Sequence, residues 1–382
     1  MKRTAISFAI ALVLAPLRSA AVGPTDSCNV GDQPAATLLF PYFQADLSVA
    51  EGKDTSIAVH NQSSAPTLAH FVLWTDWGLP TASFDAFLLG KTTVTFSLRE
   101  LFRSARAPVT GPGNRFPGCA AFLGGSLGSA TELEAKHTGQ PVGGLCWGAP
   151  RSRNRLVRGY VTVDAALRCD ASRRFPSQAS YFEGEQPVTS TANVLTGDWT
   201  LLWPGTNSAT AGNAVPIVAD RERFGSGDFT FYGRFVGYRA VDQRAPLASE
   251  WLTHYPTARG SGTQFIVWRD TRSRFTAPAA CNRTPAGLPL PHAGIRAFEG
   301  APLFRDAALP GTLPLATQLI AAGDLAGPSG LPYEFASLLM NLDSSSRRSN
   351  QAWVAWLAQP AGAGFATSSE GVRLNDLCER RP

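Results

Sequence analysis

The chain has 382 residues, a formal charge of +5 and a hydrophobic fraction of 44%. This length can bury a large core, in one elaborate domain or in two smaller ones. The weak positive charge excludes the strongly basic footprint of a nucleic-acid-binding protein.

Residues 1–21 have the pattern of a secretory signal peptide. Lys2 and Arg3 form the charged start, residues 6–14 form the apolar run, and residues 19–21 supply a small-residue cleavage site. The apolar run is too short to cross a bilayer as a stable helix. Cleavage would remove three basic residues and no acidic one, which lowers the formal charge from +5 to +2.

Residues 22–382 are therefore predicted to form a β-rich domain of an exported protein. No later segment is long and uncharged enough for a transmembrane helix. We expect a soluble protein in the periplasm or outside the cell, with no nucleic-acid partner and no transmembrane segment in the mature chain.

The stretch 36–103 is predicted to be the sheet region around which the fold is organised. Turn-forming residues separate extended segments at 37–44, 55–60, 68–77, 83–89 and 92–98. In the last of these, Val94 and Phe96 alternate with hydroxyl side chains, which places one face in the core. The segment 68–77 is apolar on both faces, which indicates a central strand covered on both sides.

Two local signals refine this region. Pro41 cannot donate a ladder hydrogen bond, which predicts a sheet edge or a bulge in the first strand. Ser97 and Glu100 have the spacing of a capping box, which predicts a short helix through Leu101 and Phe102.

The sequence of this region resembles a group of uncharacterised secreted bacterial proteins. The shared patches are LLFPYF (38–43), VLWTDWG (72–78), FDAFLLG (84–90) and SLRELF (97–102), with looser similarity in the later GDW and FIVWRD patches. The resemblance implies a secreted β-rich protein. That group has no assigned activity, so the resemblance implies no catalytic residue.

The rest of the chain predicts further sheet structure. Residues 104–150 are rich in Gly, Pro and Ser, and we expect a loop-rich excursion with one helix at 130–136. Strands are predicted at 157–164, 199–203, 228–238, 264–269 and 352–357, and helices at 316–325 and 333–342. The predicted fold class is all-β, an antiparallel β-sandwich with Greek-key or jelly-roll-like connections, short helices and long loops.

An even number of cysteines in an exported chain favours disulfides. The six candidates are Cys28, Cys119, Cys146, Cys169, Cys281 and Cys378. Our first choice of a pair is Cys119 with Cys146, because both flank one Gly-rich region. No two have C-x-x-C spacing, which disfavours a structural zinc site or a redox pair.

Residues 124–128 match the G-x-S-x-G pattern, in which a strained turn presents a serine nucleophile, here Ser126. That turn belongs to parallel sheets with crossover helices, which this chain does not predict. A triad also needs a histidine. Of the five histidines, His137 follows Ser126 too closely, and His254 and His292 are predicted to lie in loops.

The other two histidines suggest a metal site only under one condition. If the segments 55–60 and 68–77 form a hairpin, His60 and His70 become diagonal neighbours, and Asp76 would add a third ligand. Two histidines without a local ligand motif are more commonly ordinary strand residues. We therefore predict no metal and no cofactor.

Charged clusters receive a similar interpretation. The carboxylate pairs Glu183 with Glu185 and Asp220 with Glu222 are interpreted as solvated loop charge rather than as a glycosidase pair. A basic run precedes and enters the strand at 157, and it consists of Arg151, Arg153, Arg155 and Arg158. It would suit an anionic polysaccharide or a lipid head group, but a solvated approach to the strand is the preferred interpretation.

Nine tryptophans are the most suggestive residues, because exposed aromatic rings can bind sugars. Burial explains most of those that lie in or beside predicted strands, which are Trp74, Trp77, Trp199, Trp203 and Trp268. Asp76 and Asp198 each precede a tryptophan, and we expect them to cap backbone amides at turns.

No set of residues converges on one chemistry. The leading hypothesis is an exported non-enzymatic protein, a structural or interaction protein of the cell envelope or extracellular space, with a glycan or an envelope protein as partner. One alternative is a carbohydrate-binding or carbohydrate-active module, which predicts several exposed tryptophans on one face. The other is a serine hydrolase that uses Ser126.

Overall fold

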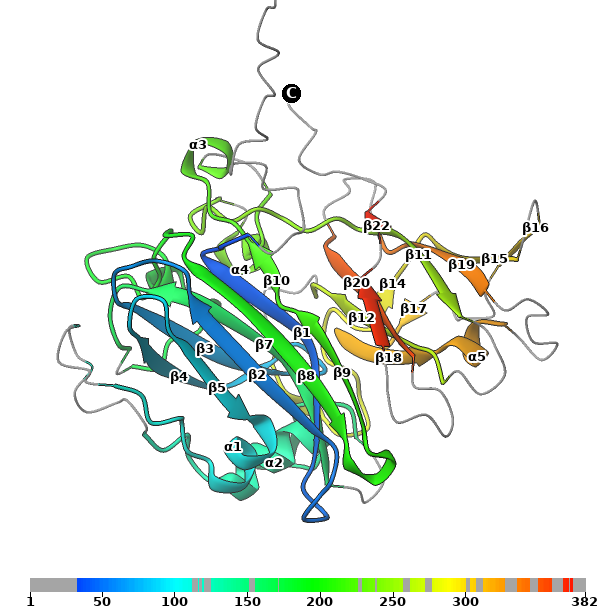
Figure 1. Ribbon diagram of the computed structural model, residues 1–382, viewed down its shortest axis with the longest axis horizontal. Coiled ribbons are helices and arrows are strands. Elements are labelled where there is room, and N and C mark those ends of the chain that lie inside the picture. Colours follow the sequence, from blue (N-terminus) through cyan, green and yellow to red (C-terminus); the bar gives the residue numbers. More distant parts are fainter. Residues whose placement is uncertain are drawn as a thin grey trace, which may run out of the picture.

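Figure 1 shows the computed structural model of the protein, which is built mainly of antiparallel strands. The residues it describes are 33–111, 116, 119, 125–150, 155–170, 172–225, 229–237, 239–256, 262–271, 277–299, 303–306, 312–326, 335–343, 350–358, 367–370 and 372–373. The predicted signal peptide at 1–21 lies outside them.

The first half of the chain forms two facing sheets. A five-stranded sheet has the order β10-β1-β7-β3-β4, and a four-stranded sheet has the order β5-β2-β8-β9. Their core includes Phe40, Ile57, Phe71, Val161 and Leu201. The strands are β1 (Thr37–Asp46), β2 (Asp54–Asn61), β3 (Thr67–Thr75), β4 (Pro80–Leu88), β5 (Thr93–Ser97), β7 (Leu156–Ala166), β8 (Leu195–Trp203), β9 (Ser208–Asn213) and β10 (Val215–Ile217).

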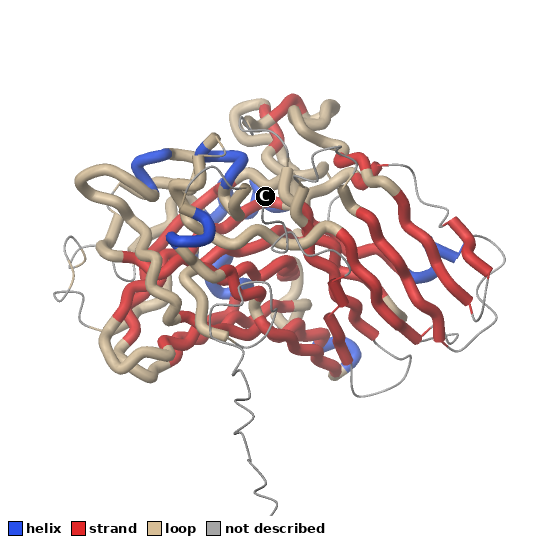
Figure 2. The backbone as a smooth tube through the Cα atoms, turned by 90° about the horizontal axis from the view of Figure 1, so that it is seen from above, coloured by secondary structure: helices blue, strands red, loops and turns tan. Residues whose placement is uncertain are grey.

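The second half forms another pair of sheets, which lies beside the first half (Figures 1 and 2). Here a five-stranded sheet has the order β16-β15-β19-β11-β22 and a four-stranded sheet the order β18-β12-β20-β21. Trp251, Phe265, Leu338 and Trp353 lie in its core. The strands are β11 (Glu250–Pro256), β12 (Gln264–Arg269), β15 (Gly294–Glu299), β16 (Leu303–Asp306), β18 (Thr317–Ala321), β19 (Phe335–Asn341), β20 (Ala352–Ala358), β21 (Thr367–Glu370) and β22 (Val372–Arg373).

Short elements complete the described structure. Two two-stranded sheets pair β6 (Leu145–Cys146) with β13 (Ala279–Ala280) and β14 (Leu290–Pro291) with β17 (Thr312–Leu313). The helices are α1 (Leu98–Ser104), α2 (Ala130–Thr138), α3 (Arg221–Phe224), α4 (Gly233–Val236) and α5 (Ala322–Ala326), with 3-10 turns η2 (Ala179–Tyr181) and η3 (Pro204–Thr206). The all-β sandwich-like fold with short helices is confirmed.

The first five-stranded sheet is buried on both faces. Leu39, Val72 and Trp74 face away from the four-stranded sheet and join a core that extends to Trp251 and Trp353 in the second half. In β3, every residue after Thr67 is buried. The prediction of a central strand covered on both sides is therefore confirmed.

The two local signals of the organising stretch are confirmed as well. The β1–β7 register shifts between Phe40 and Phe43, so Pro41 lies in a bulge. The side chain of Ser97 accepts a hydrogen bond from the Glu100 amide and caps α1.

Three predicted elements are wrong. Within the predicted helix at 333–342, residues Phe335–Asn341 form strand β19, because Leu338 and Met340 alternate with half-buried residues and pair on both sides with β11 and β15. Residues 317–321 form strand β18, and only the end of the predicted helix at 316–325 is helical. Of the predicted strand 228–238, residues 233–236 form helix α4, whose Arg234 is buried against Asp270. Long-range contacts decided each case, strand pairing in the first two and the buried ion pair in the third.

The described disulfides differ from the predicted pair. Cys119 bonds to Cys169, and Cys146 bonds to Cys281, so the predicted pairing of Cys119 with Cys146 is wrong. The reason is tertiary: β6 pairs with β13, which brings Cys281 next to Cys146 across 135 positions. Cys28 and Cys378 lie outside the described residues. Two disulfides fit an oxidising compartment.

Within the described ranges, none of the helices is both long and apolar enough to cross a membrane.

Candidate functional site

A row of polar side chains crosses the five-stranded sheet. Asp85 in β4 lies directly opposite His70 in β3, which lies opposite Asp164 in β7, which lies opposite Thr37 in β1. All four are buried. Buried polar groups are stable only when they are hydrogen-bonded, so the bonds of this row show what it does.

One end of the row is a histidine–aspartate pair. The His70 Nδ1 atom lies 2.7 Å from the Asp85 Oδ1 atom. The other oxygen of Asp85 accepts a hydrogen bond from the Asp170 amide at 3.1 Å. Burial by itself lowers the pKa of His70, but the charge and hydrogen bond of Asp85, with the charges of Asp164 and Asp170, outweigh it and raise this pKa.

The variant Asp85→Asn should therefore lower the pKa of His70, because it removes the charge that raises this pKa most. A raised histidine pKa stabilises the fold fully below the ordinary pKa, and this contribution is lost as the pH rises through the folded-state value. The variant should thus lose more stability at pH 5.5 than at pH 9. Histidine resonances followed by NMR against pH would measure this shift, with His60 on the other sheet as internal control. An unchanged His70 titration would contradict the assigned pairing.

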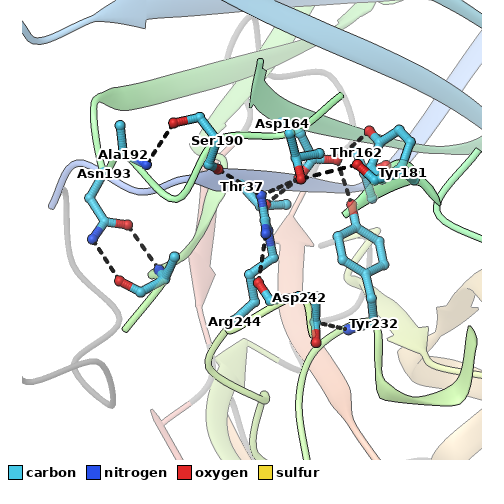
Figure 3. Close-up of polar contacts among 12 residues, drawn as sticks. Thr37, Thr162, Asp164, Tyr181, Ser190, Ala192, Asn193, Tyr232, Asp242 and Arg244 are labelled. Atoms are coloured by element: carbon cyan, nitrogen blue, oxygen red, sulfur yellow. Dashed lines mark hydrogen bonds and ion pairs between the residues drawn. The ribbon is translucent and has the colours of Figure 1, made fainter. Parts of the chain in front are cut away.

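The centre of the row is an ion pair between Asp164 and Arg244, at 3.2 Å and with 0% and 1% of the side chains exposed (Figure 3). Asp164 also accepts hydrogen bonds from the hydroxyls of Thr37, Tyr181 at 2.8 Å and Tyr232 at 3.0 Å. Every polar group here is engaged. Through Tyr181, Tyr232 and Arg244, the cluster connects β1 and β7 to the segments that pack on the outer face of the sheet.

The donors around this ion pair are held in one protonation state. Burial, followed by the charge of Asp164, raises the pKa of Tyr181 and Tyr232 well above the ordinary value, so both hydroxyls stay neutral and donate. Arg244 further donates to the carbonyl oxygens of Asp242 at 2.7 Å and Ser190 at 3.1 Å. The centre of the row thus holds the five-stranded sheet to the segments packed on its outer face by hydrogen bonds and an ion pair.

A pocket opens at the Asp85 end of the row, with an empty volume of about 590 Å³. Its polar lining consists of His70, Ser83, Asp85, Ser126, Asp170 and Arg173. Two buried polar atoms, His70 Nε2 and Ser83 Oγ, have no hydrogen-bond partner among the described residues. A water molecule or a small polar group fits such a place.

Ser126 is exposed at the rim of this pocket. Its hydroxyl bonds locally, accepting from the Gly128 amide at 3.2 Å, and its backbone forms an isolated antiparallel bridge with Arg106. Arg173 donates to its carbonyl oxygen at 2.5 Å. The described part of this segment is a loop that pairs with another loop. It therefore lacks the parallel sheet that carries the nucleophile turn in hydrolases.

The sequence analysis did not predict that His70 and Asp85 line the same pocket as Ser126. The signal was available in the register of the predicted hairpin of 68–77 and 83–89, which places these two residues opposite each other. The proximity of Ser126 depends on the loop-rich excursion, whose path no local pattern predicts.

The metal hypothesis required a hairpin that does not form. β2 pairs with β5 and β8, so His60 lies in the other sheet from His70, where its Nδ1 atom is 2.8 Å from the Thr93 hydroxyl. Asp76 accepts a hydrogen bond from the Ala149 amide, which is the capping role expected for it. Among the described residues, no group of three or more His, Cys, Asp or Glu side chains could hold a metal ion.

The two carboxylate pairs lie on the surface. Glu183 is exposed and forms an ion pair with Arg239 at 3.3 Å, and Glu185 is exposed near it. Asp220 caps α3 by accepting from the amides of Glu222 and Arg223. These contacts agree with solvated loop charge.

The remaining histidines do not line the pocket beside Ser126. His254 lies on β11, and the prediction of a loop is wrong there. His137 is buried, its Nδ1 atom lies 2.8 Å from the Arg158 carbonyl oxygen, and burial followed by the charge of Lys136 lowers its pKa to about 3. His137 is therefore neutral. His292 directly follows β14.

All nine tryptophans lie among the described residues, and none is exposed. Trp147 and Trp356 are partly buried, and the other seven are at most 6% exposed. The partly buried ring of Trp147 is covered by the Lys136 ammonium group at 4.5 Å. Asp198 is exposed beside its tryptophan.

No protein-family model, curated protein or solved structure matches this chain.

Proposed function

We propose that this is an exported protein that acts by binding or as a structural component, in the cell envelope or outside the cell, and not by catalysis. The observation that supports it is the polar row of the first sheet. Asp164 and Arg244 are saturated by hydrogen bonds from the layers around them, which suits mechanical cross-linking rather than proton transfer. The two disulfides support export.

The carbohydrate-binding alternative rested on exposed tryptophans. Since none of the nine is exposed, a stacking platform of tryptophans for sugars has no support.

The serine hydrolase remains as a second candidate, because Ser126, His70 and Asp85 line one pocket. Asp85 would hold the Nδ1–H of His70, leaving Nε2 to accept the proton of the Ser126 hydroxyl. A raised histidine pKa would confine such activity to higher pH, where the ring is neutral. The Ser126 hydroxyl bonds to Gly128 instead, so the loop would have to move.

A fluorophosphonate probe separates the two functions. On the proposed binding function, the folded, oxidised protein is not labelled, and it hydrolyses no member of an ester, peptide and glycoside panel. Labelling of Ser126, found by peptide mass spectrometry and lost in Ser126→Ala and His70→Gln, would overturn that proposal in favour of the hydrolase. The exposed Ser64→Ala is the matched control, and it should behave as the unaltered protein.

A further inference from the structure

A second pocket lies where the two halves of the molecule meet, away from the polar row. It has an empty volume of about 740 Å³ and lies between β1, β7, β12 and β18. The Thr317 hydroxyl, which belongs to the second half, donates to the Pro41 carbonyl at 2.5 Å and fixes the two halves at this place. The cavity itself, at about 290 Å³, is close to the lower end of the size range of small-molecule sites, roughly 300–1,000 Å³.

The charge of this pocket is one-sided. Lys53 and Arg158 line it, and no described carboxylate does. Arg158 is half-buried, and its side chain makes no hydrogen bond or ion pair with a described residue, although its Nε atom is fully buried. Lys53 is likewise in no ion pair with the described part of the chain.

Among the described residues, no carboxylate lies within ion-pair distance of Lys53 or Arg158. Asp46 is bonded to the Ser48 amide and hydroxyl. Asp54 accepts from Thr55, Ser97 and Arg99. His137, which contacts the Arg158 backbone, is neutral because its pKa is about 3. Arg158 is partly withdrawn from water and has no counter-ion among the described residues, which is less favourable than a paired arginine. A negative group from outside would therefore stabilise this site.

The uncharged lining supplies hydrogen bonds. Gln44 lies opposite Arg158 in the β1–β7 register, and its Oε1 atom is 3.4 Å from the Tyr42 hydroxyl. The side chains of Gln264 and Gln318 make no hydrogen bond with described residues. Amide side chains both donate and accept, which suits hydroxyl groups. Arginine binds carboxylate and phosphate oxygens in a bidentate manner, and lysine adds a point charge.

We infer that this pocket binds a small, hydroxylated oxyanion, a carboxylate or phosphate carried on a sugar-like scaffold. Arg158 and Lys53 hold the anionic group, and the three glutamines contact the hydroxyls. The site is separate from the pocket beside His70, so its test is independent of whether Ser126 reacts.

Isothermal titration calorimetry at low salt tests this inference on the oxidised protein. The probes are digalacturonate, glucose 6-phosphate, inorganic phosphate and neutral cellobiose. We expect saturable binding of an anionic probe and none of cellobiose. Tighter binding of digalacturonate identifies a uronate, and tighter binding of glucose 6-phosphate identifies a sugar phosphate. If inorganic phosphate binds as tightly as these probes, the scaffold contributes nothing, and the inference of a sugar-like scaffold is overturned.

Variants locate the binding. Arg158→Gln and Lys53→Gln should each weaken the anion by at least about tenfold. Arg155→Gln is the matched control, because Arg155 belongs to the same basic run but is paired with Glu134 at 2.6 Å, and it should bind as the unaltered protein. Circular dichroism verifies that each variant is folded. If Arg158→Gln is unstable, Lys53→Gln still tests the site, because Lys53 is exposed and its replacement should not disturb the core. Binding of no anion, or unchanged binding by both variants, would overturn the inference.

Discussion

The variant Asp164→Ala should lower the free energy of unfolding by about 3–5 kcal/mol. It leaves the guanidinium of Arg244 buried without its counter-ion and deprives the hydroxyls of Tyr181 and Tyr232 of their acceptor. An uncompensated buried charge is among the most destabilising changes known for a single residue. Urea unfolding followed by tryptophan fluorescence gives the measurement.

Two comparisons make this result specific. Glu185→Gln changes an exposed carboxylate and should leave the unfolding free energy within about 0.5 kcal/mol of the unaltered protein. The double variant Asp164→Leu with Arg244→Met removes both charges and should be less destabilised than Asp164→Ala alone, because no orphan charge remains. A double variant that is as unstable as the single one would argue against the ion pair as the source of the loss.

Replacing both Cys146 and Cys281 by serine should lower the free energy of unfolding by about 2–5 kcal/mol. This disulfide joins positions 135 residues apart, and without it the unfolded chain gains the freedom of a long loop. Thermal unfolding of the oxidised protein, compared with the variant, measures the effect.

The other described disulfide provides the matched comparison. Cys119 and Cys169 are 50 residues apart, so replacing them by serine should cost about 1 kcal/mol less than replacing the longer-range pair, if loop closure dominates. A larger loss for the shorter-range pair would mean that native contacts at Cys119, which lies in the core, decide the stability instead.

The sequence predicts elements well where the pattern is local. The bulge at Pro41 and the cap at Ser97 follow from a missing amide hydrogen and from a side chain that bonds three residues ahead. Buried strands are also found, as with 68–77. The errors occur in short apolar runs such as 333–342, where Leu338 and Leu342 fit a helix face as well as alternate strand positions. Only the pairing with the distant strands β11 and β15 resolves that ambiguity.

The sites depend even more on distant pairing. His70 and Asp85 are opposite each other in one hairpin, and a register argument finds them. Arg158 belongs to the basic run, and its lack of an ion-pair partner among the described residues is visible only in the folded structure, where β12 and β18 form the far wall of its pocket. Arg155 belongs to the same basic run, but its charge is neutralised by the ion pair with Glu134. Sequence spacing does not distinguish these two arginines.

The sheet that is covered on both faces has a consequence for the order of folding. Its strands are complete by residue 217, but the contacts that cover its outer face come later, with Arg244 bonded to Thr37 across 207 positions and Thr317 to Pro41 across 276. Until the last third of the chain docks, Leu39, Val72 and Trp74 lie on an open apolar surface. Such non-local closure is slow and prone to aggregation. We expect the docking of the second half to limit the rate of folding, and the first half to be most prone to aggregation before that docking.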